Sequence, residues 1–387
     1  MKFSSRLKEV KRVHWHMVRK LINAKEAQGV KTISLASGNP DLPTPPIIVE
    51  AACQALRDPT YHRYPFSFQT RYGEAVASWY RDRFEVELNP ATEVRPLAGS
   101  QEGIGNLALT VMEPGAIALI PAPAYDSYAR ATRFAGGEAY LLPLQAENDF
   151  LPDLKAIPND VLDRARLLWL NYPNNPTGAV APLSFFEEVV DFARRNDIWV
   201  CHDNAYSDVS FDGYMAPSFL AVDGAKEVGI ELNTLSKAFN MAGWRLGMAV
   251  GNPELLDALS FVSFNTSMGL FGPSQIAAIE ALTTDQSWML ERNERYRKRR
   301  DILVDGLRAI GLELQRPRAT LYVWAKLPPG FSDSLEFSKW VLDQTGVWIT
   351  SGIFFGPAGE GYVRASITLP ADDLSEAMER LQTLKLY

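Results

Sequence analysis

Short apolar runs alternate with amphipathic helical patterns from about residue 46 to residue 285. Apolar residues cluster in four runs that each predict a strand with its exit loop, at residues 114–125, 165–178, 197–206 and 230–237. Between two of these runs, residues 183–196 repeat apolar positions at helical spacing. Because strands that alternate with helices are typical of a parallel sheet covered on both faces, we predict an α/β domain with a mainly parallel central sheet.

After residue 285 the pattern changes to that of a smaller α+β unit. Apolar residues recur at helical spacing through "ERNERYRKRRD" (291–301), so we interpret this basic run as the solvated face of a long helix. Residues 320–327 and 361–368 predict strands, and residues 372–384 predict a closing helix. We expect an N-terminal segment, residues 1–45, to pack with this small domain, residues 286–387, beside a large domain, residues 46–285.

The N-terminal stretch predicts an amphipathic helix, from the spacing of Val10, Val13, Met17, Leu21 and Ile22. It contains no uninterrupted apolar run of the kind that marks a secretory signal. No window of about 20 apolar residues is free of charge, so we expect no membrane span.

Composition narrows the classes of function. The net charge of −7 argues against a general affinity for nucleic acid or anionic membranes. Only Cys53 and Cys201 occur, without metal or redox spacing, and so few cysteines suit a reducing cytoplasm. We expect no metal site.

Polar residues follow every predicted strand of the large domain. They are Gly99, Ser100 and Gln101 in a fifth strand-like run, "RPLAGSQEG" (95–103), then Tyr125, then Asn175, then Asp203 and Tyr206, and last Thr234, Ser236 and Lys237. In open parallel sheets ligands bind beyond the carboxyl ends of the strands. Because five strands end in polar groups on the same edge, the sequence predicts a binding site there.

These polar residues can share one specific chemistry. A helix N-terminus at residues 99–101, the hydroxyls of Thr234 and Ser236, and the guanidinium of Arg245 suit a phosphate dianion. Tyr125 offers an aromatic face to a flat ring, and Asp203 can hold a protonated ring nitrogen. Asn175 and Tyr206 can hydrogen-bond a phenolic oxygen, and Lys237 is the amine that can condense with an aldehyde. A phosphate, a pyridinium, a phenolate and an aldehyde together describe pyridoxal phosphate.

Eight motifs carry a resemblance to a known family: "SGNPD" (37–41), "YHRYP" (61–65), "GSQEG" (99–103), "PAPAY" (121–125), "NYPNNPTG" (171–178), "DNAY" (203–206), "SKAFNMAGWRLG" (236–247) and "VRASI" (363–367). In this order, and across most of the chain, they resemble the fold-type-I pyridoxal-phosphate enzymes of the class I/II aminotransferase family. The resemblance implies a ping-pong transfer of an amino group between an amino acid and a 2-oxo acid.

The resemblance also assigns roles. It makes Lys237 the Schiff-base lysine and proton shuttle, Asp203 the partner of the pyridine nitrogen, and Tyr125 the residue stacked on the ring. Phosphate ligands would be the backbone of Ser100 and Gln101 with Thr234, Ser236 and Arg245, and ligands of the ring hydroxyl would be Asn175 and Tyr206. Arg364 would clamp the substrate α-carboxylate, which the backbone near Gly38 would also touch. Tyr64, or its neighbour Tyr61, would reach the phosphate of a second subunit, which implies a homodimer.

Three rival functions remain open at this level. Cystathionine-type C–S lyases, decarboxylases and synthases of the same fold have the same cofactor-binding residues. Some transcriptional regulators carry such a domain, but behind a DNA-binding domain for which no room precedes residue 37. "GIGNLA" (103–108) matches a dinucleotide-binding pattern, although Gly103 is expected inside a helix rather than at a tight turn.

The substrate is less specified than the reaction. The opening "LASGNPDLPTPP" and the lysine motif look similar to the branch that holds LL-diaminopimelate aminotransferases, with 2-oxoglutarate as acceptor. Gln101 stands where the diaminopimelate and aspartate enzymes often carry a lysine, so alanine, aspartate and aromatic donors remain open.

Overall fold

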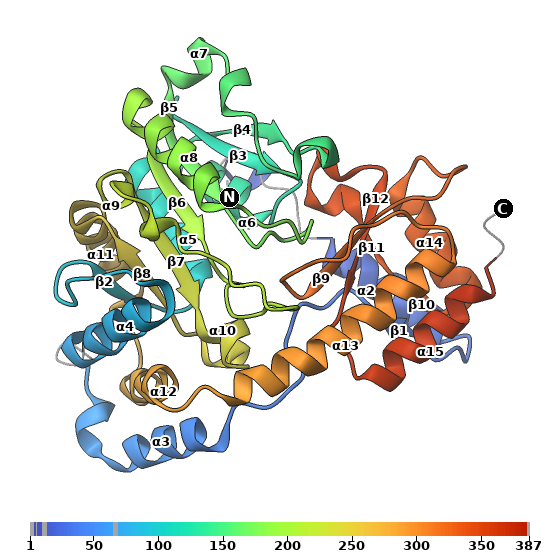
Figure 1. Ribbon diagram of the computed structural model, residues 1–387, viewed down its shortest axis with the longest axis horizontal. Helices are drawn as coiled ribbons and strands as arrows, with labels where there is room; N and C mark the ends of the chain where they lie inside the picture. Colours follow the sequence, from blue (N-terminus) through green and yellow to red (C-terminus); the bar gives the residue numbers. More distant parts are fainter. Residues whose placement is uncertain (1–3, 5, 10–13, 65–68, 385–387) are drawn as a thin grey trace.

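Seven strands form the central sheet in the computed structural model, which describes residues 4, 6–9, 14–64 and 69–384 (Figure 1). They are β2 (Val94–Leu97), β3 (Ile117–Ala122), β4 (Glu138–Pro143), β5 (Ala165–Leu170), β6 (Trp199–Asp203), β7 (Gly229–Thr234) and β8 (Gly247–Gly251). Their order is β2-β8-β7-β6-β5-β3-β4. Only β8 runs against its neighbours, so the carboxyl ends of the other six strands lie on one edge.

Helices cover both faces of this sheet. One face packs against α3 (Pro46–Arg57), α4 (Gln69–Phe84), α8 (Leu183–Asn196) and α12 (Gly272–Thr283). The other packs against α5 (Ser100–Val111), α6 (Ser127–Phe134) and α11 (Pro253–Ser267). Short helices α7 (Asn159–Leu162), α9 (Ala225–Val228) and α10 (Leu235–Ala238) complete the connections. Strands β3, β7 and β8 are buried along their whole length, as expected of strands covered on both faces.

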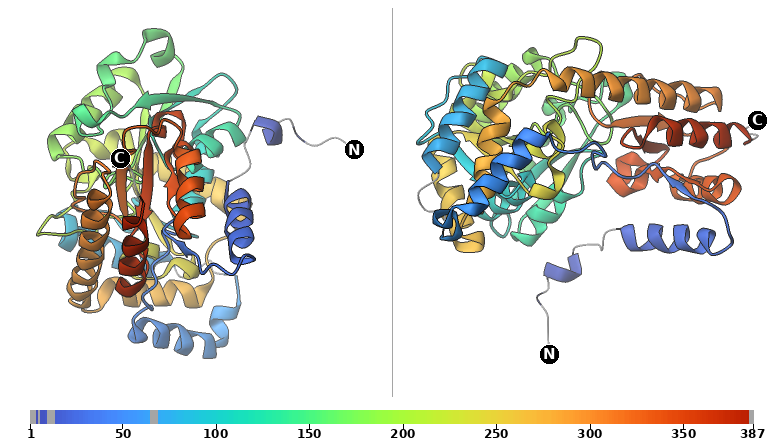
Figure 2. Two further views of the ribbon diagram at one scale, coloured as in Figure 1. Left: turned by 90° about the vertical axis from the view of Figure 1, so that its right-hand side faces the viewer. Right: turned by 90° about the horizontal axis from the view of Figure 1, so that it is seen from below.

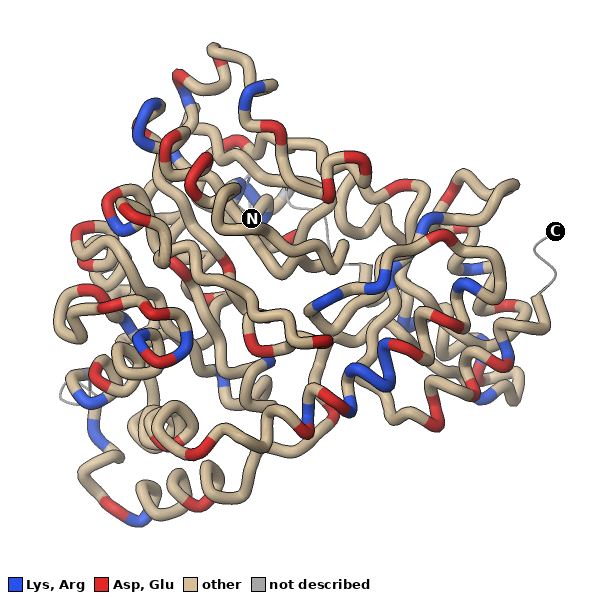
Figure 3. The backbone as a smooth tube through the Cα atoms, in the orientation of Figure 1, with Lys and Arg blue, Asp and Glu red and all other residues tan. Residues whose placement is uncertain are grey.

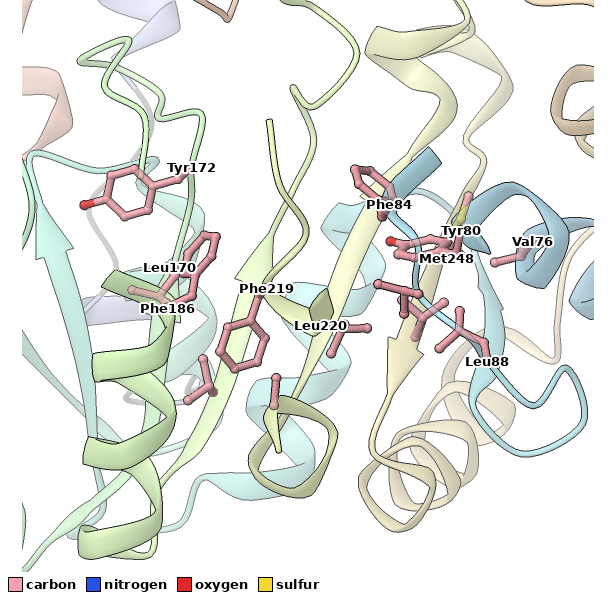
Figure 4. Packing of buried hydrophobic residues seen from close by; sticks show 14 of the residues in the cluster. Val76, Tyr80, Phe84, Leu88, Leu170, Tyr172, Phe186, Phe219, Leu220 and Met248 are labelled. Atoms are coloured by element: carbon pink, nitrogen blue, oxygen red, sulfur yellow. The ribbon is translucent and has the colours of Figure 1, made fainter. Parts of the chain in front are cut away.

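Aromatic side chains fill the space between the sheet and the first helical layer (Figure 4). Tyr80 and Phe84 of α4 lie beside Met248 of β8, and Phe186 of α8 packs edge-on against Phe219 at 5.9 Å between ring centroids. Removing such large apolar side chains from water is the main favourable contribution to folding.

A smaller unit lies beside the large sheet. Its antiparallel sheet, in the order β11 (Thr350–Ser351), β12 (Tyr362–Ser366), β9 (Tyr322–Lys326), shares a core with α13 (Trp288–Ala309) and α15 (Ala371–Gln382). Strand β1 (Ile33–Ser34) pairs with β10 (Val347–Trp348), and α2 (Trp15–Glu26) contacts α14 (Ser334–Thr345). The N-terminal segment therefore joins elements more than 300 residues later in the chain (Figure 2).

The predicted elements largely match those observed. Strands β3, β5, β6, β9 and β12 lie within the predicted runs, β7 begins one residue before its run, and α8 has the predicted bounds. The run at 230–237 is partly wrong, because α10 begins at Leu235. For the N-terminal helix, α2 contains Met17, Leu21 and Ile22, whereas Val10 and Val13 lie outside the described residues. Among the helices of the described residues, none is long and apolar enough to cross a bilayer.

The basic run of α13 is helical as predicted, but it is not only a solvated face. Acidic and basic positions are mixed along the helix (Figure 3). Arg292, Arg299 and Arg300 are buried, and Arg299 forms a bidentate pair with Asp41 at 2.7 and 2.8 Å. Arginine binds carboxylates in this forked geometry, so part of the run fixes α13 against neighbouring segments. Helical periodicity alone did not reveal this role.

A fully buried carboxylate, Glu231 of β7, organises the core behind β6. It accepts hydrogen bonds from Tyr80, His202, Asn204, Ser218 and the backbone N–H of Phe219, all between 2.8 and 3.1 Å. Burial would raise the pKa of Glu231, but the hydrogen bonds, led by that of His202, outweigh burial and hold the pKa below its usual value.

We expect Glu231→Gln to lower the free energy of unfolding by roughly 2–4 kcal/mol, because an amide nitrogen cannot accept from these donors. Urea denaturation measures the change. Glu227→Gln is the matched control, since Glu227 forms an exposed ion pair with Arg194 and should lose less than about 1 kcal/mol. Equal losses in the two variants would contradict the assigned role.

Candidate active site

The polar residues that follow the strands meet around one cavity of about 250 Å³. Its walls come from both the large sheet and the smaller unit, through Tyr322 of β9 and Arg364 of β12. It is lined by every site residue predicted from the sequence except Tyr64: Gly38, Ser100, Gln101, Tyr125, Asn175, Asp203, Tyr206, Thr234, Ser236, Lys237, Arg245 and Arg364. Residues more than 300 positions apart therefore share one site.

Lys237 lies in α10, directly after β7, and its side chain enters the cavity. Its Nζ donates a 2.6 Å hydrogen bond to the carbonyl oxygen of Gly38. Burial lowers the pKa of the ammonium; Tyr322 opposes this shift and Arg364 reinforces it. A lowered pKa increases the fraction of free amine, which is the form that acts as a nucleophile or a base.

Asp203, at the end of β6, presents an unpaired carboxylate oxygen. Its Oδ2 accepts a 2.7 Å hydrogen bond from the Tyr128 hydroxyl, whereas its buried Oδ1 has no partner among the described residues. Burial raises the pKa of Asp203 to about 6. A buried carboxylate with a free oxygen is suited to a cationic partner, which restores its ionised form.

An anion cradle lies at the start of α5. Gly99 caps the helix with φ of 78°, a conformation that favours glycine, and a Cβ there would lie 2.7 Å from Nη2 of Arg245. The backbone N–H groups of Ser100 and Gln101 have no acceptor among the described residues. The Thr234 and Ser236 hydroxyls lie 2.9 Å apart on the same cavity wall. Helix N–H groups, hydroxyls and a guanidinium together favour a phosphate.

Arg364 is buried at the opposite side of the cavity. It donates hydrogen bonds of 2.8 Å to Asn175 Oδ1 and 2.7 Å to the carbonyl oxygen of Ala36, and its guanidinium lies 4.0 Å above the Tyr322 ring. Its Nε has no partner among the described residues. A buried guanidinium with a free donor is suited to a carboxylate ligand. A Cβ on Gly38 would collide with the Tyr322 hydroxyl, so any other residue there would require the Tyr322 side chain to move.

Three residues that contribute to the site, Tyr128, Asn171 and Tyr322, were not predicted from the sequence. Tyr128 bonds Asp203 and stacks on Trp169 at 5.2 Å, and Asn171 donates a 2.7 Å hydrogen bond to the Asp203 carbonyl oxygen. Asn171 opens a quoted motif and Tyr128 closely follows one, which is the signal that could have found them. Tyr322 also lines the cavity, and its place there follows only from the packing of β9.

The dinucleotide-binding alternative is wrong. Gly103 and Gly105 lie inside α5, and a Cβ on Gly103 would meet Leu97 and Leu232, so this glycine serves helix–sheet packing. A tight turn between strand and helix, which that pattern requires, lies earlier at Gly99.

The mainly parallel sheet, with a cavity at the carboxyl ends of its strands that Lys237 enters, defines an α/β fold with its ligand site at this edge. The family model of the class I and II aminotransferases matches residues 30–381. An LL-diaminopimelate aminotransferase of Dehalococcoides mccartyi is 48% identical over 386 residues, covering 100% of this chain and 99% of that protein. The chain belongs to the class I and II aminotransferases.

Solved structures agree with this membership. Substrate-bound BacF from Bacillus subtilis has a TM-score of 0.93 at 38% identity, covering 99% of this chain and 98% of that one. A probable N-succinyldiaminopimelate aminotransferase from Thermus thermophilus has a TM-score of 0.91 at 40% identity, covering 95% of this chain and 99% of that one. The fold-type-I architecture and the aminotransferase activity expected from the sequence are confirmed.

Proposed function

We propose that the cavity binds pyridoxal 5′-phosphate and that the enzyme transfers the amino group of LL-diaminopimelate to 2-oxoglutarate. The observation that carries the cofactor is the unpaired, buried Oδ1 of Asp203 opposite the amine of Lys237 in one cavity. The relatives support the donor, because the Dehalococcoides protein is an LL-diaminopimelate aminotransferase and shares nearly the whole chain.

The residues fit the parts of this cofactor. The free N–H groups of residues 100 and 101, with Arg245, suit its phosphate. Asp203 suits its protonated ring nitrogen, and the bound cation would lower the pKa of Asp203 again. Asn175 accepts from Arg364 through Oδ1, which leaves its amide N–H groups, together with the Tyr206 hydroxyl, to donate to the ring oxygen.

Bound in this way, the cofactor supplies an aldehyde for the amino group and a ring that accepts electrons from the substrate α-carbon. Lys237 would bind the aldehyde through its amine and, as the free amine, would accept and return the proton of the substrate α-carbon. Asp203 would hold the ring nitrogen in its protonated form. Arg364 orients the donor by its α-carboxylate, and the carbonyl oxygen of Gly38 holds the Lys237 amine in place.

We further propose a homodimer. Tyr64 is 67% exposed and lies outside the cavity of its own chain, and η1 (Pro59–His62) packs against Gly272 at the start of α12. Two phenylalanine side chains shortly before Gly272 in the sequence are also exposed, Phe261 at 73% and Phe271 at 55%. Exposed apolar side chains of this size support a subunit interface, across which Tyr64 would reach the second phosphate. A cytoplasmic location, suggested by the two free cysteines, is part of the same proposal.

A visible absorption spectrum of the purified protein tests the proposal. We expect a band from the cofactor attached to Lys237, which LL-diaminopimelate bleaches and 2-oxoglutarate restores. Alanine, aspartate and aromatic amino acids added in turn identify the donor if LL-diaminopimelate is not used. Release of pyruvate and thiol from cystathionine without an acceptor would instead favour a C–S lyase. Absence of the band in protein supplied with the cofactor would refute the cofactor assignment.

A further inference from the structure

A second cavity, of about 200 Å³, adjoins the first. The two share Trp15, Ala36, Tyr125 and Arg364 among their lining residues. The second cavity is lined by residues of α2, α6 and the smaller unit, and Lys237 is not among them. Because Arg364 lines both cavities, a substrate held by Arg364 at its α-carboxylate has this space within reach of its side chain.

Two residues that line the second cavity but not the first, Asp126 and Arg130, form an ion pair. Nε of Arg130 lies 3.4 Å from Oδ2 of Asp126, one helical turn earlier on the same side of α6. Arg130 Nη2 donates a 2.8 Å hydrogen bond to Ser127 Oγ, which in turn donates at 2.8 Å to Gln101 Oε1. Tyr125 donates to the same Gln101 oxygen at 3.0 Å. The guanidinium is thus linked through Ser127 to Gln101, a residue of the first cavity.

Neither partner of this pair is fully engaged. Arg130 donates a single side-chain hydrogen bond among the described residues, so its Nη1 has no acceptor there. The Asp126 carboxylate accepts none from those residues. The Arg130 side chain is 23% exposed and that of Asp126 47% exposed, so a ligand can reach both.

The remaining walls suit a short methylene chain. Phe354 and Phe355 line the cavity, and the His14 ring stacks on Phe354 with ring centroids 4.1 Å apart. Apolar and aromatic walls with a few fixed polar groups at the far end are typical of pockets that select a side chain by its length and terminal charge.

We propose that Arg130 and Asp126 select the distal end of the donor: Arg130 binds a distal carboxylate and Asp126 binds a distal ammonium. The proposal rests on the proposed function and names the residues that give it its substrate class. Together with Arg364, the pair offers two guanidiniums and one carboxylate to an amino acid that carries a second zwitterion. An acceptor with a distal carboxylate but no distal ammonium needs Arg130 alone.

The half-reaction of the cofactor-loaded enzyme, followed without an acceptor, tests this assignment with Arg130→Gln, Asp126→Asn and the control Arg133→Gln. Arg133 lies on the same helix but lines neither cavity, so its variant removes the same charge without touching the pair. The donors are LL-diaminopimelate, L-glutamate and L-alanine, which carry a distal zwitterion, a distal carboxylate and no distal group. KM here is the donor concentration that gives half the maximal rate of this half-reaction.

The three donors give a distinct pattern. Arg130→Gln should raise KM about 10- to 100-fold for LL-diaminopimelate and L-glutamate and leave L-alanine within about twofold, because a charge-assisted hydrogen bond is lost only with the first two. Asp126→Asn should raise KM about 10-fold or more for LL-diaminopimelate alone. Arg130→Lys should recover part of the L-glutamate loss.

Other patterns overturn the assignment. If Arg130→Gln raises KM for L-alanine as much as for L-glutamate, or behaves like Arg133→Gln, Arg130 does not bind the distal carboxylate. If Asp126→Asn affects L-glutamate and LL-diaminopimelate equally, Asp126 does not bind an ammonium. A wild-type enzyme inactive with LL-diaminopimelate refutes the proposed donor, while the comparison of L-glutamate with L-alanine still decides the role of Arg130. A wild type that uses neither dicarboxylic donor refutes both.

Discussion

Replacing Lys237 by alanine should lower kcat by about 10⁴-fold or more. A positioned proton-transfer group alone contributes about 10²–10⁴-fold, and Lys237 also provides the amine for covalent attachment. The measurement is the rate of the half-reaction with LL-diaminopimelate in rapid-mixing experiments, with the near-ultraviolet circular dichroism spectrum as a check on folding. The visible band from the attached cofactor should also disappear.

Lys237→Arg separates chemistry from charge. Arginine keeps the positive charge near Gly38, but its guanidinium stays protonated and serves neither as base nor as nucleophile. We expect this variant to be as inactive as Lys237→Ala. If it keeps more than about a tenth of the wild-type rate, Lys237 acts only through its charge, and the proposed role is wrong.

The second large effect is expected at Asp203. Asp203→Asn should lower kcat by roughly 10²–10³-fold, the range found when one preorganised electrostatic group is removed, because an amide does not hold the ring nitrogen protonated. Folding should be preserved, since an amide can still accept the hydrogen bond of Tyr128 through its oxygen. A rate within about threefold of wild type would show that this carboxylate does not act on the ring.

In the cofactor-free protein, the raised pKa of Asp203 should make the free energy of unfolding depend on pH. Burial raises the pKa of Asp203 from 3.8 to about 6, so between these pH values the folded chain binds more protons than the unfolded chain. The protonated Asp203 carboxyl makes its full contribution to the free energy of unfolding below about pH 4, and this contribution is lost as the pH rises to about 6. One pKa unit corresponds to about 1.4 kcal/mol, which makes the loss roughly 3 kcal/mol.

Asp203→Asn should remove this loss. Without cofactor, the variant should match wild type near pH 4 and exceed its free energy of unfolding by up to about 3 kcal/mol at about pH 7. Urea titrations at several pH values measure the difference. Asp223→Asn, at a position outside the buried core, should follow wild type throughout. A difference that does not change with pH would mean that the pKa of Asp203 is not raised.

The hydrophobic pattern was sufficient for most elements of the large domain because its strands are buried on both faces and its helices are amphipathic. The hydrophobic pattern did not predict features that depend on contacts between segments distant in the sequence. Strand β4 has mixed exposure at the edge of the sheet, and β8 runs antiparallel, which no local pattern encodes. Arg299 looks like any solvated arginine until Asp41 is brought to it by the packing of a distant segment.

The site shows the same division. The sequence determined its chemistry by itself, because Asp203 ends one strand and Lys237 lies in the turn of helix after another, and the carboxyl ends of parallel strands share one edge. Only the tertiary structure decided which residues approach from elsewhere. Arg364 bonds Asn175, which lies 189 residues earlier in the sequence, and Tyr322 joins the site from β9. Arg130 lines a cavity whose other walls come partly from the smaller unit, so its proposed role depends on how that unit packs. Contacts between elements depend on packing, and packing is a property of the whole chain rather than of any segment.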